Sequence, residues 1–285
     1  MNTAYSIHDA TLTADDAQSL PFGAFAPSAT QALVLRLAHG SGLKRGAFRP
    51  MLSRILNLLR PGPLDVSFQG ADFRLYHQAS ATERGALLNP DYDREELDFL
   101  RRHTPVGGVV VDVGANVGTY ALTLAHHVGP RGMVVAIEPH PVTHARLRFN
   151  REASGLAHVR LFAAAAADTD GELTIATDDE NLGASHIVTS GAGAGAFKVA
   201  SLRLQAILER AGAGKVDALK IDVEGFEDRV LTGFFRDVPE TLWPRAVVIE
   251  HLSRDEWRRD CLADMIGCGY REHGRTRSNT LLLRN

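Results

Sequence analysis

The segment Val109–Tyr120 constrains the fold of this chain more than any other. It begins with four valines in five positions, a β-branched run typical of a buried parallel strand. Gly114 and Gly118 follow, and an apolar helical pattern then continues to Val128. This order predicts a strand, a tight turn and a helix. Gly114 permits the backbone dihedral angles of the turn and the close approach of a ligand, to which the new helix offers unpaired N–H groups.

Two acidic residues at predicted strand ends indicate the chemistry of that ligand. Asp112 stands two residues before Gly114. A carboxylate there would repel a pyrophosphate on the helix N-terminus, as in a dinucleotide site, but would attract an ammonium group. Glu138 ends the next apolar run, where an acid commonly binds ribose hydroxyls. Together with Asn116 and Gly118, these residues favour an amino-acid-bearing nucleoside such as S-adenosylmethionine. An α/β turn without a cofactor is the alternative.

The composition is that of an ordinary globular protein, with 285 residues, 45% hydrophobic and 23% charged. A formal net charge of −3 gives no strong field for nucleic acid. Cys261 and Cys268 form neither a CxxC motif nor a disulfide framework, which fits a reducing compartment. The N-terminus lacks the pattern of a signal peptide, and no apolar run approaches the roughly 18 residues of a membrane span. We therefore expect a cytoplasmic protein with no nucleic-acid partner and no stable membrane insertion; nothing in the sequence specifies an oligomeric state.

Residues 1–80 are expected to form an appendage to a main domain of residues 81–285. The first 28 residues predict a loose polar arm. Residues 29–60 place leucines at helical spacing with basic residues between them, which predicts helices packed on the main domain; contact with a membrane or partner is the alternative. Pro61–Pro63 ends this pattern, and alternating residues over 64–76 predict a β-hairpin.

Beyond a predicted helix at 93–102, strands and helices alternate, which is the pattern of a mostly parallel sheet covered on both faces. Strands are predicted near 109–113, 133–138, 158–162, 216–222, 245–250, 268–273 and 279–283, and helices at 118–128, 141–154, 201–211, 226–235 and 255–266. A short extra strand is expected at 171–175, and the glycine–alanine segment 191–196 predicts a loop. Because only a turn separates the last two strands, we expect a terminal antiparallel hairpin. The fold class is thus α/β, with the Rossmann-like sheet of class I methyltransferases.

Three motifs resemble those of the FkbM family of S-adenosylmethionine-dependent methyltransferases: VDVGANVG at 111–118, EPHP at 138–141 and LKIDVEGFE at 219–227. The segment VVIEH at 247–251 is similar too. The resemblance covers roughly residues 90–285, and the third motif is the most family-specific, since the first two occur widely among class I methyltransferases. It implies O-methylation of hydroxyl groups on sugars, polyketides or other natural products.

The resemblance also implies roles for particular residues. Asp112 to Gly118 would hold the methionine end of the cofactor, and Glu138 would bind the ribose hydroxyls. The segment Ala164–Asp168 would face the adenine, with Asp168 accepting a hydrogen bond from its exocyclic amine. A helix-forming alanine segment is the alternative for this part of the chain.

Methylation of a hydroxyl requires a base or a metal ion close to the oxygen, because the hydroxyl reacts poorly until its proton is removed. Asp222, Glu224 and His251 follow predicted strands at the carboxyl edge of the sheet, where open α/β sheets bind ligands. His251 is the simplest base near neutral pH, since the ordinary pKa of histidine is about 6.5. These three residues are the catalytic candidates.

The same carboxylates offer a metal site as an alternative. Asp222, Glu224 and Glu250 could hold Mg²⁺, which prefers oxygen ligands. Without a metal ion, they would bind substrate hydroxyls through hydrogen bonds. Lys220, two residues before Asp222, is expected to pair with a neighbouring acid and to be structural.

Three functions remain open. The first is an S-adenosylmethionine-dependent O-methyltransferase acting on a hydroxyl of a sugar, glycan or secondary metabolite. The second is an NAD-dependent oxidoreductase, against which the position of Asp112 and the presence of Asn116 in place of a second close glycine argue. The third is a non-catalytic cofactor-binding scaffold, which would not need polar side chains at three strand ends.

Overall fold

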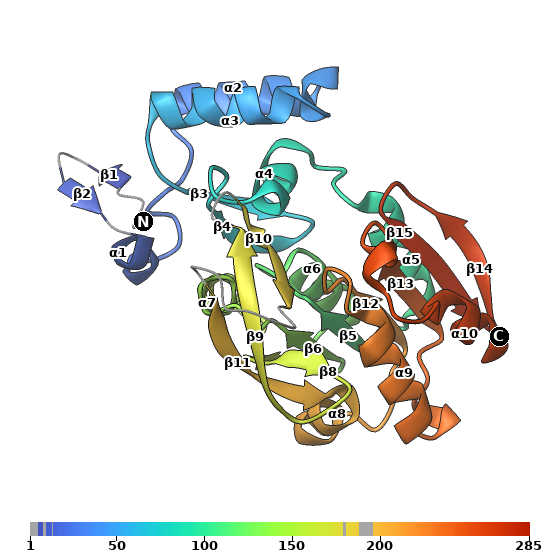
Figure 1. Ribbon diagram of the computed structural model, residues 1–285. Helices are drawn as coiled ribbons and strands as arrows, with labels where there is room; N and C mark the ends of the chain where they lie inside the picture. The colour runs from blue at the N-terminus through green and yellow to red at the C-terminus, as the bar shows by residue number, and fades with distance from the viewer. Residues whose placement is uncertain (1–4, 8–9, 13, 179–180, 188–195) are drawn as a thin grey trace.

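A computed structural model describes residues 5–7, 10–12, 14–178, 181–187 and 196–285. Its centre is a seven-stranded sheet with the order β14-β15-β13-β12-β5-β6-β7 (Figure 1). The parallel strands are β5 (Val109–Val113), β6 (Met133–Ile137), β7 (Val159–Phe162), β12 (Ala218–Ile221) and β13 (Ala246–Glu250). The antiparallel strands are β14 (Tyr270–Arg275) and β15 (Asn279–Arg284). This order, with the terminal hairpin beside β13, confirms the predicted class I methyltransferase sheet.

Helices cover both faces of the sheet because successive side chains of a strand point to opposite sides. Val110 of β5 packs in one hydrophobic cluster with Leu122 of α6, whereas Val111 packs in another with Val230 of α9. One face carries α5 (Arg94–His103), α6 (Thr119–Val128) and α7 (Pro141–Ala153), and the other carries α8 (Leu204–Ala211), α9 (Glu227–Asp237) and α10 (Cys261–Gly267). Short 3₁₀ helices η2 (Glu240–Leu242) and η3 (Arg254–Glu256) lie in the connections.

A second, smaller sheet was mostly not predicted. It contains β8 (Ala165–Ala167), β9 (Gly171–Asp178), β10 (Asn181–Ile187) and β11 (Phe197–Arg203), in the order β10-β9-β11-β8. The helix predicted from residue 201 begins only at Leu204, because residues 197–203 pair with β9 and β8. Strand pairing with distant residues overrides the local helical spacing here. The predicted loop at 191–196 falls almost wholly outside the described residues.

The N-terminal part forms an outer layer and a hairpin. Its elements are β1 (Tyr5–Ile7), β2 (Ala10–Leu12), α1 (Ala14–Ser19), α2 (Ala29–His39), η1 (Gly42–Lys44), α3 (Phe48–Leu59), β3 (Leu64–Phe68), β4 (Ala71–Leu75) and α4 (Ala81–Leu88). Helices α2 and α3 contact each other and α4, and they lie at the outside of the molecule in Figure 1. Leu35, Leu56 and Phe73 share a hydrophobic cluster with Val110, so packing is continuous across the boundary proposed near residue 80.

A buried ion pair holds the segment that was expected to be a loose arm. Arg74 of β4 contacts Asp65 of β3 at 2.7 Å, and both side chains are almost fully buried. Arg74 also donates hydrogen bonds to the carbonyl oxygens of Ala17 at 2.6 Å and Pro21 at 2.8 Å. Residues from α1 onward are therefore fastened to the hairpin. Among the described residues, no helix has the length and apolar character that a membrane span requires.

Candidate active site

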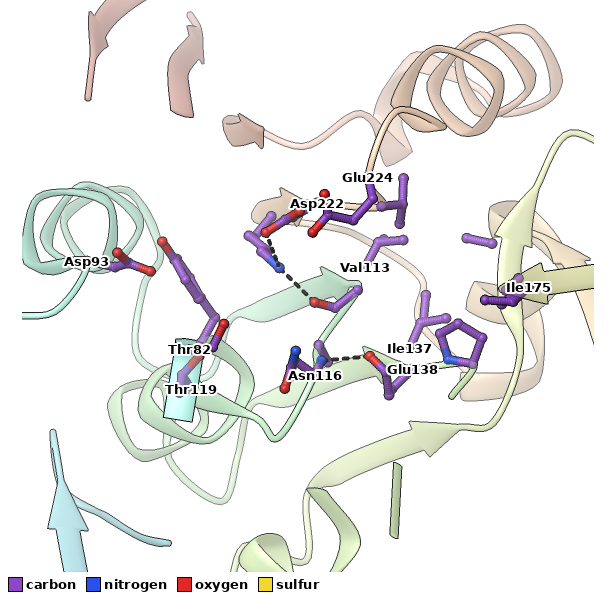
Figure 2. Close-up of a pocket in the computed structure, with 18 of the residues that line it drawn as sticks. Thr82, Asp93, Val113, Asn116, Thr119, Ile137, Glu138, Ile175, Asp222 and Glu224 are labelled. Atoms are coloured by element: carbon purple, nitrogen blue, oxygen red, sulfur yellow. Dashed lines mark hydrogen bonds and ion pairs between the residues drawn. The ribbon is translucent and has the colours of Figure 1, made fainter. Parts of the chain in front are cut away.

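A cavity opens at the carboxyl ends of β5, β6 and β12 (Figure 2). It contains about 930 Å³ of empty space, part of which is open to solvent. The walls are the glycine loop after β5, Glu138 after β6, strand β8 and the loop after β12. This is the edge of the sheet at which ligands were expected.

The glycine loop takes a conformation that other residues would disturb. Gly114 has φ +75°, and a Cβ atom there would lie 1.8 Å from the carbonyl oxygen of Asp222. Gly118 has φ +97°, and its Cβ would lie 2.6 Å from a methyl group of Leu147. Asn116 between them also has a positive φ, +49°. Gly114 is thus required by dihedral angle and by space, because a backbone atom blocks its Cβ position, and Gly118 chiefly by its dihedral angle.

Glu138 is held at the floor of the cavity by three hydrogen bonds. Its carboxylate accepts from the backbone N–H of Asn116 at 2.8 Å, the N–H of His140 at 2.9 Å and the hydroxyl of Thr143 at 2.8 Å. Burial raises the pKa of Glu138, while these donors favour the ionised form. The residue therefore presents a fixed acceptor to the cavity, as the hydroxyls of a ribose would require.

Asp112, which was expected to hold the methionine end of the cofactor, is not among the residues that line the cavity. Its carboxylate is fully buried beneath the loop, 3.5 Å from the ammonium group of Lys220. Burial raises the pKa of Asp112, and the Lys220 charge opposes this shift. Lys220 donates to the carbonyl oxygen of Gly114 at 2.7 Å and lies 3.7 Å from Asp222. The expected pairing of Lys220 is confirmed, and Asp112 supports the loop from below because β5 directs its side chain away from the cavity.

One wall of the cavity is apolar and close-packed. Ile137, Pro139, Ala165, Ala166 and Ile175 form it, and Figure 2 shows Ile137 and Ile175 on this side of the cavity. A flat aromatic ring can lie against small alanine side chains. Because Ala165–Ala167 form strand β8, the alternative of a helix-forming alanine segment is wrong, and Ala165 and Ala166 face the cavity.

Asp168, the expected partner of the adenine amine, lies elsewhere. Strand β8 ends at Ala167, and the chain turns so that Asp168 packs against α9. A Cβ atom on Gly233 of that helix would lie 3.4 Å from the Cα atom of Asp168. The acceptor role expected for Asp168 is not supported by this position.

Three carboxylates line the rest of the cavity: Figure 2 shows Asp222 and Glu224 side by side, with Asp93 apart from them on the left of the view. Glu224 has φ +52°, a left-handed conformation that costs a non-glycine residue energy. Burial, together with the charges of Asp222 and Glu250, raises the pKa of Glu224 to about 7. The structure thus brings Asp222 and Glu224 to the cavity, as predicted.

Asp93 is a site residue that the sequence did not reveal. Burial and the charge of Glu96 raise its pKa to about 7, and a hydrogen bond from the Tyr120 hydroxyl opposes this shift. Asp93 has φ +49° and precedes α5. In the sequence an aspartate in this position indicates only a helix cap, so no signal marked it as part of a cavity.

His251 makes its contacts outside the cavity. Its Nδ1 atom lies 3.0 Å from the hydroxyl oxygen of Thr280, and its backbone N–H donates to the carbonyl oxygen of Ser278 at 2.9 Å. These contacts join the end of β13 to β15. The imidazole is therefore placed to support the terminal hairpin, away from Asp222 and Glu224.

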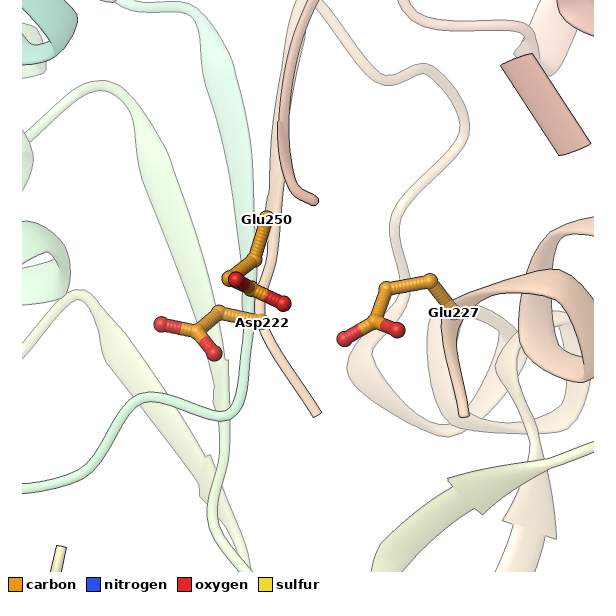
Figure 3. Close-up of side chains that lie close together, drawn as sticks. All are labelled: Asp222, Glu227 and Glu250. Atoms are coloured by element: carbon orange, nitrogen blue, oxygen red, sulfur yellow. The ribbon is translucent and has the colours of Figure 1, made fainter. Parts of the chain in front are cut away.

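A cluster of three carboxylates includes Asp222 of the cavity wall and differs from the expected metal set. Asp222, Glu227 and Glu250 have carboxylate oxygens within 4.8 Å of one another (Figure 3). Glu227 takes the place that was expected for Glu224.

Protein donors already occupy two members of this cluster. Glu227 accepts from the N–H groups of Val223 at 2.7 Å and Gly225 at 3.1 Å, and from the indole N–H of Trp257 at 2.7 Å. Glu250 accepts from the backbone N–H groups of the two residues after His251. These bonds explain the cluster as a support for the loops after β12 and β13, so the donor set does not point to a metal ion.

The strand order and the cavity between a glycine loop and a buried acid define a class I methyltransferase. Residues 112–274, more than half of the chain, match the family described as "Methyltransferase FkbM domain". The protein belongs to the FkbM methyltransferase family, and S-adenosylmethionine is its cofactor. This match supports a methyltransferase over the NAD-dependent oxidoreductase and the non-catalytic scaffold. No curated protein sequence matches it.

Solved structures of several methyltransferases match about two thirds of this chain at low similarity. An rRNA methylase from Streptococcus thermophilus has 11% identity and a TM-score of 0.41, over 67% of this chain and 94% of that chain. Precorrin-6y C5,15-methyltransferase from Geobacter metallireducens has 12% identity and a TM-score of 0.40, over 68% and 86%. A SAM dependent methyltransferase from Aquifex aeolicus has 14% identity and a TM-score of 0.37, over 68% and 90%. At such low identities these matches do not indicate the acceptor.

Proposed function

We propose that the protein methylates a hydroxyl oxygen of a small-molecule or glycan acceptor, with Glu224 as the general base. The observation that carries this proposal is the carboxylate of Glu224 at the cavity wall, with a pKa of about 7. A base is most effective when its pKa is near the working pH. Such a base is needed for a hydroxyl, whose proton must leave as the methyl group is transferred.

The described residues fit the proposed position of the cofactor. Glu138 would accept hydrogen bonds from the ribose hydroxyls, and the apolar wall with Ala165 and Ala166 would receive the adenine. Asp222 and Glu224 make the other end of the cavity negative, which suits a cationic sulfonium and ammonium. When bound, S-adenosylmethionine supplies an activated methyl group.

The acceptor is expected between Glu224 and Asp93. Glu224 would take the hydroxyl proton on its carboxylate, while alignment of the oxygen with the methyl group supplies much of the rate. Asp93, held by Tyr120, would orient a second polar group of the acceptor. Three carboxylates at this end disfavour a polyanion such as RNA, since nucleic-acid sites neutralise phosphates with cations.

We infer that the reaction needs no Mg²⁺. Glu227 and Glu250 use their oxygens as acceptors for backbone and indole N–H groups. Glu224, which the sequence placed in the metal set, serves as the base in this scheme. Asp168 and His251 have no role in catalysis or cofactor binding in this proposal.

Transfer of a labelled methyl group to a panel of hydroxylated acceptors tests the function. We expect an alkali-stable product, because a methyl ether resists the hydrolysis that cleaves a methyl ester. Glu224→Gln should abolish most of the transfer. Glu209→Gln, an exposed change on α8, is the matched control. Transfer to nitrogen or carboxylate acceptors alone, or full activity of Glu224→Gln, would contradict the proposal.

A further inference from the structure

The outer helices α2 and α3 expose an unusual amount of apolar surface. Among the described residues, eleven large apolar side chains are exposed, and seven of them belong to these two helices. These seven, here called the α2–α3 face, are Leu33, Leu37, Phe48, Met51, Ile55, Leu58 and Leu59. Concentrated apolar surface of this kind marks an interaction site, whereas isolated exposed residues are normal.

The pattern along α3 shows why this surface remains uncovered. Leu52 and Leu56 are buried and pack into the main hydrophobic cluster. Met51, Ile55 and Leu58 follow the adjacent side of the helix and are exposed, Leu58 by 83%. The apolar arc of α3 is thus wider than its contact with the protein. One part of the arc builds the core, and the other is free to meet a partner.

The same segment has a one-sided charge. Residues 29–63 contain six lysines and arginines and no aspartate or glutamate. Since the whole chain carries −3, the remainder carries −9. Arg36, Arg45 and Arg54 are exposed and form no ion pair with any described residue, whereas Lys44 pairs with Asp91 at 2.7 Å. Three exposed arginines of this segment therefore carry charges that no described acidic residue neutralises.

We propose that the α2–α3 face docks on the surface of an anionic lipid bilayer. Apolar side chains flanked by lysine and arginine are the features of helices that lie in the membrane interface, and anionic headgroups attract such cations. A second copy of the chain fits less well, because a symmetric contact would bring six cations against six. Neither helix crosses the bilayer; α3 has 12 residues.

Docking would also place the entrance of the active site near the lipid. Ala47, Arg49 and Pro50 of the α3 region line a groove together with Tyr92 and Asp93. Tyr92 and Asp93 also line the cofactor cavity. The groove therefore runs from the first turn of α3, next to Phe48 of the α2–α3 face, to Tyr92 and Asp93 of the methyl-transfer site, so that an acceptor held at the membrane surface could enter it.

Sedimentation with vesicles tests the docking surface directly. We expect the protein to sediment with vesicles of equal parts phosphatidylglycerol and phosphatidylcholine, and far less with phosphatidylcholine alone. Leu58→Asp should weaken this partition about tenfold or more, because burial of one leucine side chain is lost. Ile266→Asp on α10 replaces another exposed apolar residue, 54% exposed, and should leave the partition unchanged.

A second variant tests the charges. Replacement of Arg36, Arg45 and Arg54 by glutamine should reduce partition into the anionic vesicles about a hundredfold. Each cation near an anionic surface contributes about 1 kcal/mol, and three of them together give this factor. The melting temperature and the binding of S-adenosylhomocysteine should stay at wild-type values in both variants, which separates docking from folding and from the methyltransferase site.

Three outcomes would overturn the proposal. One is partition that does not depend on anionic lipid. Another is equal loss of partition in Leu58→Asp and Ile266→Asp. The third is that the protein does not bind vesicles but uses the same face to form a dimer or to bind an RNA oligonucleotide. Loss of the dimer in Leu58→Asp, or of RNA binding in the arginine variant, would identify that face.

Discussion

The ammonium group of Lys220 donates a hydrogen bond to the carbonyl oxygen of Gly114, 2.7 Å away. This bond joins strand β12 to the glycine loop that forms the floor of the cavity. Lys220 also lies between the carboxylates of Asp112 and Asp222. One buried cation therefore organises the strand end, the loop and the acidic wall.

Lys220→Met should strongly destabilise the protein. The change leaves Asp112 without a partner, although its side chain is only 1% exposed. Breaking a buried pair from one side costs about 3–5 kcal/mol, and urea unfolding measures it. Lys215→Met removes an ion pair to Asp217 in which the lysine is 53% exposed, and should cost about 0–1 kcal/mol.

The double variant Asp112→Asn with Lys220→Met provides the control for this mechanism. It removes both charges, so it should be more stable than Lys220→Met alone. Equal free energies of unfolding in the Lys220 and Lys215 variants would show that the buried pair has no special structural importance.

Gly114→Ala should impair both folding and cofactor binding. Its Cβ would meet the carbonyl oxygen of Asp222, so the loop must move. Gly129 has a similar φ of +70° but open space around it. Gly129→Ala should therefore cost only the conformational strain, about 1–3 kcal/mol because its ψ of −179° is one that essentially only glycine adopts, with unchanged affinity for S-adenosylhomocysteine. Thermal melts and calorimetric titration compare the two, and similar affinities would contradict the assigned packing.

Local patterns were enough to predict the central sheet. Short runs dominated by apolar residues became β5, β6, β12 and β13, and glycine or an acid marks the end of each run. Parallel strands place their carboxyl ends on one edge of the sheet. Glu138 and Asp222 both end predicted parallel strands, so both were expected at that edge.

Residues whose positions depend on distant segments could not be predicted in this way. Strand β11 forms through its pairing with β9, which local sequence does not reveal. The last three residues of this strand were therefore predicted as the start of a helix. The sequence placed Asp112 beside the ligand, because local residues do not show which face of β5 its side chain takes. Packing of β5 against α6 decides this. Asp93 enters the cavity from the N-terminus of α5, and His251 turns toward Thr280 of β15.

The pH dependence of methyl transfer should report Glu224. Its pKa is raised from 4.5 to about 7, so the carboxyl group is protonated and inactive as a base below that pH. We expect kcat/KM to rise about tenfold per pH unit below 7 and to level above it. Glu224→Gln should lower kcat by about 10²–10⁴ and remove this dependence.

His251→Gln serves as the comparison, because the imidazole contacts Thr280. It should leave the pH profile and kcat near the wild-type values. A profile that loses its rise in His251→Gln, but keeps it in Glu224→Gln, would identify the histidine as the base.

Removal of divalent metal should leave activity unchanged. Two of the three clustered carboxylates accept hydrogen bonds from the protein, so Mg²⁺ would have to displace those donors. Millimolar Mg²⁺ should not raise the melting temperature, whereas S-adenosylhomocysteine should, because a ligand that binds the native state stabilises it. Loss of activity in EDTA that returns with Mg²⁺ would contradict the metal-free scheme.

Calorimetric titration with S-adenosylhomocysteine tests the central claim, that the cavity beside Glu138 is the cofactor site. Wild-type protein should bind with micromolar affinity, and Glu138→Gln should bind at least about tenfold more weakly, since hydrogen bonds to a charged acceptor contribute about 1.5–3 kcal/mol. Glu152→Gln, an exposed change on α7, is the matched control and should match wild type. Equal affinities in the two variants, or binding of NAD in place of S-adenosylhomocysteine, would contradict the account.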